Sequence, residues 1–184
     1  MSEYHNQKAL VLQYYENLEA ANAESVEEVI SKFNSTELQW YGVFPFNEQY
    51  GVPAVAEAFW KPFLNSWSNV QRRQDIFLAG TNEIDHTDWV ISMGHFMGYL
   101  DKSWLGLPAK NRILFLRYAE FNCIQNGIIT RSSFFCDMIG LMQQMNINVL
   151  PLQTGSSFIY PGPRTHDGLL FEPQDFQESV RTLD

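Results

Sequence analysis

The sequence predicts an α+β fold in which helices pack on one face of a curved antiparallel sheet. The first third of the chain has helical periodicity, whereas residues 70–136 contain four long runs rich in β-branched and aromatic residues. The 184 residues are 45% hydrophobic and 15% aromatic, enough to form a core without metals or disulfides. We expect one domain over residues 1–184, with a core at about 8–147 and an extended, proline-containing tail at 148–184.

Three helices are predicted in the first third of the chain. Residues 8–21 place apolar side chains at helical spacing, with glutamates turned the other way. Ser25 and Glu28 have the spacing of a capping box, which would start a second helix. A third helix is expected from Pro53, with a kink at Pro62 because proline lacks a backbone donor.

The strands include one turn whose register has two solutions. A short strand is expected at 37–41, and four long strands are expected at 70–80, 89–100, 112–124 and 128–136. Asn126-Gly127 is a strong type I′ turn signal, so the last two strands form a hairpin. A strict two-residue turn pairs Glu120 with Ser133, whereas a bulged turn places Glu120 on the face of Ser132 and Phe134.

The strand at 112–124 is apolar on both of its sides. Neither its even nor its odd positions are polar enough to face water. We expect helices to cover one face of the sheet and a second protomer to cover the other, because twofold dimers are the commonest soluble assembly. The sequence therefore predicts a homodimer through the outer face of the sheet.

Charge and motif content exclude several function classes. The formal net charge of −9 argues against nucleic-acid and anionic-membrane binding. The apolar runs are shorter than the ~20 residues that span a bilayer. Two cysteines and no charged-then-apolar leader indicate a cytoplasmic protein with reduced thiols. There is no phosphate-binding glycine loop, zinc-ligand spacing or nucleophile elbow, so no cofactor and no metal are expected.

Several motifs in the second half of the chain resemble one family. They are Gly98 to Leu100, Gly106-Leu107-Pro108-Ala109 with Arg112, Asn126-Gly127-Ile128-Ile129, and Asp137, Gly140, Leu141 and Gln144. In order and spacing they resemble the SnoaL-like polyketide cyclases, within the nuclear transport factor two-like superfamily. The resemblance implies a cone-shaped, curved antiparallel or mixed sheet, with three N-terminal helices on its concave face and a ligand cavity between them. It also implies a cofactor-free aldol condensation in which a carboxylic acid serves as general acid and base.

Two departures from the family pattern concern the catalytic residues. Aligned on Asp137 and Gln144, the catalytic aspartate of the family falls at Phe134, which cannot transfer a proton, and the pocket histidine falls at Glu120. Glu120 has apolar neighbours and is therefore the expected catalytic base, with His95 as a catalytic donor. The structural alternatives are an ion pair with Arg117 or Arg112 for Glu120 and a core position for His95.

Asp137 is the third catalytic candidate. It is placed to cap the short helix that follows, and at a cavity mouth it would also orient a ligand. The cavity wall is expected to be apolar and aromatic with few polar groups. The candidates for lining it are Trp40, Trp60, Trp89, Arg117, Tyr118 and Phe134.

Two functions follow from this reading. The first is a cofactor-free cyclase, isomerase or lyase acting on a hydrophobic carbonyl compound, in which Glu120 removes a proton and His95, Tyr118 or Arg117 stabilises the enolate. The alternative is a non-catalytic protein on the same fold that binds a hydrophobic small molecule or serves as a dimeric interaction module. A Glu120 exposed to an open cavity favours chemistry, whereas a Glu120 paired with an arginine in a closed aromatic interior favours binding.

Overall fold

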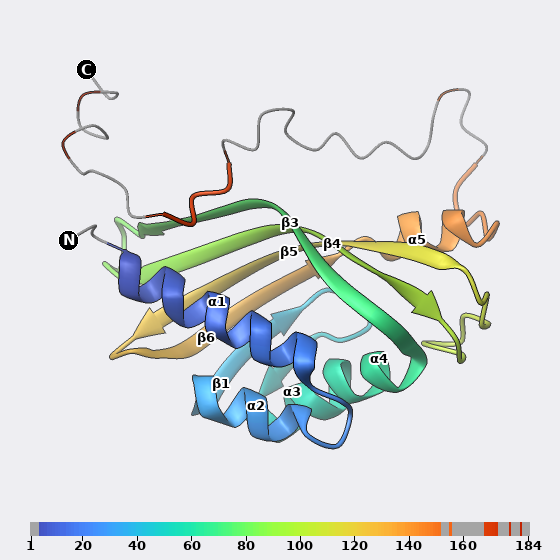
Figure 1. Ribbon diagram of the computed structural model, residues 1–184, viewed down its shortest axis with the longest axis horizontal. Helices are drawn as coiled ribbons and strands as arrows, with labels where there is room; N and C mark the ends of the chain where they lie inside the picture. Colours follow the sequence, from blue (N-terminus) through green and yellow to red (C-terminus); the bar gives the residue numbers. More distant parts are fainter. Residues whose placement is uncertain (1–3, 152–154, 156–167, 173–176, 178–180, 182–184) are drawn as a thin grey trace.

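A mixed sheet of six strands forms the centre of the computed structural model, which describes residues 4–151, 155, 168–172, 177 and 181. The strands are β1 (Asn34–Gly42), β2 (Glu48–Tyr50), β3 (Trp67–Thr81), β4 (Asp88–Leu100), β5 (Ile113–Gln125) and β6 (Ile128–Cys136). Their order is β2-β1-β6-β5-β4-β3, and β1 runs parallel to β6 while all other neighbours are antiparallel. The predicted α+β class with a curved, mixed sheet is confirmed (Figure 1).

Helices before β3 pack on one face of this sheet (Figure 1). They are α1 (His5–Ala20), α2 (Val26–Phe33) and a continuous segment of α3 (Val52–Val55), the π-helical turn η1 (Ala56–Trp60) and α4 (Lys61–Ser66). Pro62 lies in the first turn of α4, directly after the π-helical turn, at the place where the sequence predicts a kink. Another short helix, α5 (Met138–Gln144), follows β6.

Two local features differ from the sequence prediction. The capping box is wrong: the side chain of Ser25 makes no cap bond, and its Oγ accepts from the N–H of Asn22 instead, at 3.0 Å. The Oδ1 of Asn22 accepts from the N–H groups of Glu24 and Ser25 at 2.9 Å, so a local asparagine turn competes with the box. The second difference is β2, which lies in a segment expected to be a loop.

The hairpin between β5 and β6 adopts the bulged register. Asn126 and Gly127 both have positive φ, at 53° and 75°, as a type I′ turn requires. The strands pair in step up to Ile124 opposite Ile129, after which the register shifts and Cys123 lies opposite Arg131. This shift places Glu120 directly opposite Phe134, so both side chains point to the helical face of the sheet.

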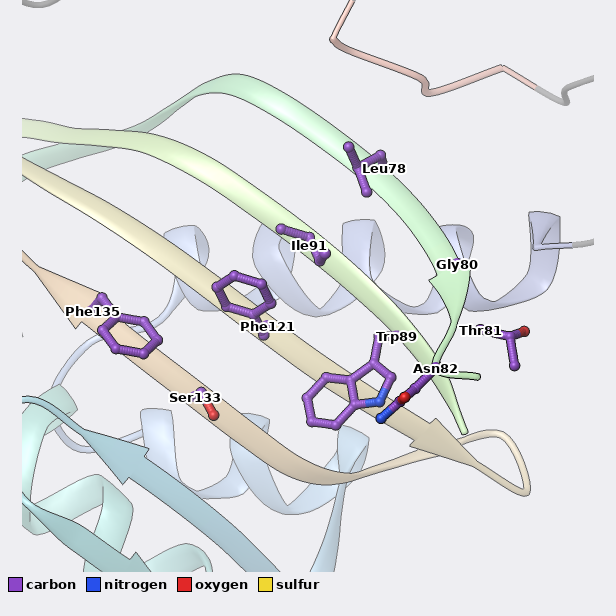
Figure 2. A pocket seen from close by; sticks show the side chains of 9 residues that line it. All are labelled: Leu78, Gly80, Thr81, Asn82, Trp89, Ile91, Phe121, Ser133 and Phe135. Atoms are coloured by element: carbon purple, nitrogen blue, oxygen red, sulfur yellow. The ribbon is translucent and has the colours of Figure 1, made fainter. Parts of the chain in front are cut away.

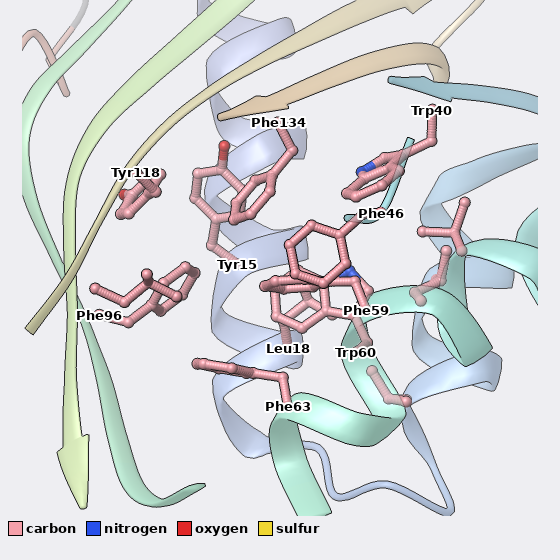
Figure 3. Packing of buried hydrophobic residues seen from close by; sticks show 14 of the residues in the cluster. Tyr15, Leu18, Trp40, Phe46, Phe59, Trp60, Phe63, Phe96, Tyr118 and Phe134 are labelled. Atoms are coloured by element: carbon pink, nitrogen blue, oxygen red, sulfur yellow. The ribbon is translucent and has the colours of Figure 1, made fainter. Parts of the chain in front are cut away.

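Aromatic side chains fill the space between the helices and the sheet (Figure 3). The ring of Phe59 lies 4.7 Å from that of Phe134, and the ring of Phe63 lies 5.3 Å from that of Phe96. Trp40 stacks on Phe134 with a centroid distance of 5.9 Å. These residues come from β1, the π-helical turn, α4, β4 and β6, so the cluster joins both layers of the fold.

Residues 168–172 pack on β3, which is an edge strand of the sheet. The N–H of Phe77 donates to the carbonyl of Gly168, and the carbonyl of Phe77 accepts from the N–H of Leu170, both at 2.8 Å. The buried ammonium of Lys8 in α1 donates to the carbonyls of Leu170 and Glu172. The segment therefore pairs part of an open sheet edge and is joined to the first helix.

The contact between β3 and β4 leaves no space for a side chain at Gly94. A Cβ at this position would overlap the backbone carbonyl of Arg73, whereas a Cβ at Gly80 would meet nothing within 4 Å. We expect Gly94→Ala to lower the free energy of unfolding by about 2 kcal/mol, because a backbone contact has to open. Gly80→Ala is the matched control, and urea unfolding of the two variants is the measurement. Equal stability of the two would contradict this account.

Candidate functional site

A buried ion pair lies on the helical face of the sheet. Nη1 of Arg72, on β3, donates to Oε2 of Glu120, on β5, at 2.7 Å. The two side chains are 2% and 3% exposed. Glu120 therefore forms an ion pair with an arginine, which is the structural alternative to a catalytic role. The arginine is Arg72 and not the expected Arg117 or Arg112.

Aromatic rings surround the guanidinium of Arg72. Its central carbon lies 3.7 Å from the ring centre of Tyr15 and 4.7 Å from those of Phe96 and Tyr118. Burial by itself would lower the pKa of Arg72, but Glu120 and the two tyrosine oxygens outweigh it and raise this pKa. Arg72 is therefore held in its charged form inside an aromatic enclosure.

Buried polar groups on both sides of the pair satisfy one another. The hydroxyls of Ser92 and Tyr118 lie 2.8 Å apart, and Nε2 of Gln74 donates to Oγ of Ser92 at 3.1 Å. On the other side, Nδ2 of Asn122 donates to the hydroxyl of Tyr15 at 3.0 Å, and Oγ of Ser132 donates to Oδ1 of Asn122 at 2.7 Å. Such networks fix side-chain positions in a core.

The void beside this pair is small. It measures about 20 Å³, which is room for one water molecule. Its walls come from α1, η1, α4, β3 and β4. The lining residues are Leu18, Glu19, Trp60, Phe63, Leu64, Val70, Arg72 and Phe96.

The expected grouping of His95 and Arg117 with Glu120 is corrected by the structure. His95 and Arg117 lie opposite each other on β4 and β5, on the outer face of the sheet, because alternate residues of a strand point to opposite sides. The ring of His95 packs on Phe115, and its Nδ1 lies 3.8 Å from Oδ2 of Asp75. Neither residue therefore shares a space with Glu120.

Asp137 caps α5, as predicted. Its Oδ1 accepts from the N–H of Gly140 at 2.7 Å, the bond that an N-terminal cap makes. Asp137 also borders a shallow hollow of about 360 Å³ on the outer face, together with Arg117 and Phe135.

The pocket-lining candidates divide between the two faces. Trp40, Trp60, Tyr118 and Phe134 lie in the buried aromatic cluster (Figure 3). Trp89 and Arg117 lie on the outer face and border hollows there, so their expected place inside the cone is wrong.

The ligand-sized hollow around Trp89 opens on the outer face of the sheet and measures about 510 Å³. Trp89, Phe121 and Phe135 contribute rings to it from β4, β5 and β6, while the small residues Gly80 and Ser133 lie on β3 and β6 (Figure 2). Its lining residues are Leu78, Gly80, Thr81, Asn82, Trp89, Ile91, Phe121, Ser133 and Phe135. The shallow hollow at Asp137 shares Phe135 with it, so the two adjoin.

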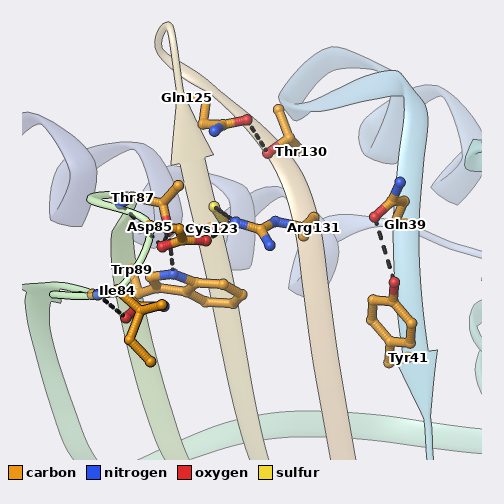
Figure 4. A network of polar contacts seen from close by, with 11 residues as sticks. Gln39, Tyr41, Ile84, Asp85, Thr87, Trp89, Cys123, Gln125, Thr130 and Arg131 are labelled. Carbon is orange, nitrogen blue, oxygen red and sulfur yellow. Dashed lines mark hydrogen bonds and ion pairs between the residues drawn. The ribbon is translucent and has the colours of Figure 1, made fainter.

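Polar contacts hold Trp89 in place (Figure 4). Its Nε1 donates to Oγ1 of Thr87 at 2.8 Å. The guanidinium of Arg131 lies 5.2 Å from the ring centre of Trp89 and pairs with Asp85 at 2.9 Å. Trp89 is thus a preformed wall of the outer hollow.

Neither a cluster of metal ligands nor a membrane-spanning helix occurs among the described residues. They contain no group of three or more His, Cys, Asp and Glu side chains that could hold a metal ion. None of the helices in this part of the chain is long and apolar enough to cross a membrane. Cys123 and Cys136 are free thiols, and burial raises the pKa of Cys136 to about 12.

Several solved structures have a fold similar to that of this chain. No family model and no curated protein matches the sequence. A protein assigned as a SnoaL-like polyketide cyclase from Jannaschia sp. CCS1 has a TM-score of 0.59 at 15% identity, over 82% of this chain and 98% of that one. IdmH from Streptomyces antibioticus, assigned as a polyketide cyclase, has a TM-score of 0.62 at 9% identity, over 75% and 96%. An NTF2-like protein from Burkholderia thailandensis E264 has a TM-score of 0.52 at 16% identity, over 74% and 94%. The chain therefore has the cone fold shared by SnoaL-like polyketide cyclases and NTF2-like proteins.

Proposed function

We propose that this protein is a non-catalytic binding and interaction protein on the SnoaL-like fold. The observation that carries the proposal is the closed pair of Glu120 and Arg72, with side chains 3% and 2% exposed. A general base has to reach the proton that it removes, either directly or through one water. The carboxylate of Glu120 contacts the guanidinium of Arg72 where a substrate proton would have to lie. The role that we propose for Glu120 is therefore to balance the buried charge of Arg72.

The residue opposite Glu120 supports the same role. The family resemblance places the catalytic aspartate of the cyclases at Phe134, and the ring of Phe134 packs between Trp40 and Phe59. A phenyl ring has no proton to transfer, but it adds to the aromatic interior. The assignment as a polyketide cyclase was made for the structural neighbours and is not carried over to this chain.

The competing function is a cofactor-free cyclase or isomerase. One observation favours it: Glu120, Arg72 and Tyr118 lie together on one face of the sheet, where a base would need donors beside it. Incubation with cyclohexanone in D₂O separates the two functions. We expect no exchange of the α-protons above the buffer rate, and exchange that Glu120→Gln abolishes would establish the enzyme instead.

A charge-balancing role predicts the stability of three variants. Glu120→Gln leaves a buried guanidinium without its counter-charge, and we expect the free energy of unfolding to fall by about 3 kcal/mol. Arg72→Met should cost a similar amount for the converse reason. The double variant Arg72→Met/Glu120→Gln removes both charges and should recover most of the loss in urea unfolding. Losses that simply add in the double variant would exclude this role.

We also propose that a second copy of the chain covers the outer face of the sheet. A row of side chains crosses five strands there, from Leu78 through Ile91, Phe121 and Ser133 to Tyr41. Phe135 is 49% exposed beside the outer hollow. Monomeric proteins seldom expose a contiguous apolar patch of more than a few hundred Å². In a twofold contact, a projecting ring of each copy would meet the hollow of the other.

The dimer predicts the effect of one charge on this face. Phe135→Lys should convert the protein to a monomer, because an ammonium would be buried in an apolar interface. Leu105→Lys, at an exposed turn after β4, is the matched control and should leave the dimer intact. Sedimentation equilibrium gives the mass of each. A monomeric wild type would refute the proposed interface.

His95 predicts a pH dependence of stability. Burial lowers the pKa of His95, Asp75 opposes this shift, and Arg73 and Arg117 add to it. The unfolded chain then binds the proton more tightly, so stability is full above the unfolded pKa of about 6.5 and decreases as the pH falls below it. We expect His95→Gln to remove this decrease in melting curves between about pH 7 and 5. An identical pH profile in the variant would show that His95 does not contribute.

A further inference from the structure

The edge of β3 binds a short extended segment of the chain (Figure 1). β3 is the last strand of the sheet, and on its open side Phe77 forms a parallel bridge with Leu169. The N–H of Phe77 donates to the carbonyl of Gly168, and the carbonyl of Phe77 accepts from the N–H of Leu170, both at 2.8 Å. Main-chain bonds of this kind are how a peptide is added to the edge of a sheet.

Two apolar side chains of the segment share one side. Leu169 packs against the hydrophobic core, and the ring of Phe171 lies 5.4 Å from that of Phe77, which is fully buried. Residues two positions apart in an extended segment point the same way, so both side chains face β3 and the core. The site therefore fits an aliphatic residue followed, two positions later, by an aromatic residue.

Lys8 of α1 forms the second part of this site. Lys8 is 3% exposed, and its Nζ donates to the carbonyls of Leu170 and Glu172. Burial lowers the pKa of Lys8, and the charge of Glu172 opposes this shift. A buried ammonium is costly without acceptors, and the segment supplies these two carbonyls. The folded core thus requires an extended segment at this position, whichever chain supplies it.

We propose that this site, the edge of β3 at Phe77 together with Lys8, exchanges its own residues 168–172 for those of a second copy of the chain. The second copy is the partner because it carries the sequence that fits the site. The contacts of an exchanged segment are the same as those within one chain, so exchange changes no interaction at the site. Release costs little, because two backbone bonds and one side chain hold the segment.

The exchange is reciprocal and separate from the outer-face contact. Each copy has one segment and one site, so two copies that exchange segments form a closed dimer. This contact uses the edge of the sheet, whereas the dimer proposed above uses its outer face. The inference therefore goes beyond the proposed function and does not depend on it.

Disulfide cross-linking of full chains tests the exchange. A Cβ at Gly168 would lie 3.4 Å from Cγ1 and 3.8 Å from Cα of Ile76, close enough for two cysteines to form a disulfide. Chains labelled with ¹⁵N that carry Ile76→Cys are mixed with unlabelled chains that carry Gly168→Cys, and oxidised glutathione is the oxidant. Mass spectrometry then identifies the disulfide between a labelled and an unlabelled chain.

We expect a yield about tenfold above that of a control pair, because docking holds the two thiols at a high effective concentration. The control pair is Ile84→Cys with Gly168→Cys, since Ile84 is 91% exposed in the turn between β3 and β4. Equal yields from the two pairs would overturn the exchange.

Lys8→Met tests the part of the site on α1. The variant keeps an unbranched side chain but loses the donor for both carbonyls, so the segment should be docked for a smaller fraction of the time. We expect the amide of Phe77 to exchange with D₂O about tenfold faster, the effect of losing a hydrogen bond to a charged group. Lys102→Met is the control, because Lys102 is exposed in the loop after β4. Equal exchange in the two variants would overturn the role of Lys8.

Two further variants separate the outcomes. In Ile76→Cys/Gly168→Cys, a disulfide within each chain, together with none between chains in the mixture, overturns the exchange and leaves the segment on its own edge. No disulfide in either experiment overturns the site itself. Added to both chains of the mixture, Phe135→Lys should leave the cross-link between chains in place. Its loss there would assign the contact to the outer face and overturn the edge as the place of exchange.

Discussion

The ion pair between Arg72 and Glu120 is the constraint on which the rest of the interior depends. Two charges that leave water need opposite partners and good geometry, and even then they add little net stability. The pair spans β3 and β5, with β4 between them, and Tyr15 of α1 lies against the guanidinium. One interaction thus sets the distance between the helical layer and three strands, which gives the interior a single arrangement.

The aromatic content of the chain has two uses in this fold. Inside, rings from the helices and from the strands fill the space between the two layers. Outside, Trp89, Phe121 and Phe135 surround a hollow on the opposite face. Among the described residues, the ligand-sized hollow at Trp89 therefore lies on the outer face, and the fold alone does not determine a function.

Local patterns predicted most of the elements, because each depends on residues close in sequence. The four long strands, the Asn126-Gly127 turn and the cap at Asp137 are of this kind. The capping box at Ser25 was not found, because Asn22 three residues earlier offers a competing acceptor.

The site was harder to predict, because its members meet only through tertiary contacts. Arg72 looks like a solvent-facing residue in its own strand, and its burial depends on Glu120 from another part of the sequence. The face of His95 relative to Glu120 likewise follows from the pairing of β4 with β5. Arg117 lies on β5 three residues from Glu120, so alternation within that strand already places it on the other face. The turn dipeptide Asn126-Gly127 was compatible with both a strict and a bulged register of the hairpin. The sequence shows which residues of one strand share a face of the sheet. Which residues of neighbouring strands share that face depends on the register between the strands.

The parallel pairing of β1 with β6 sets the order in which the chain can complete its core. β1 ends at Gly42 and finds its partner from Ile129 onward, so about ninety residues must be present before this pair closes. Phe134 arrives with that last strand and covers Trp40 and Phe59. During synthesis these rings stay without their cover until β6 has left the ribosome, while β3, β4 and β5 can already form a local meander. Completion of the aromatic interior is thus a late, non-local event in folding.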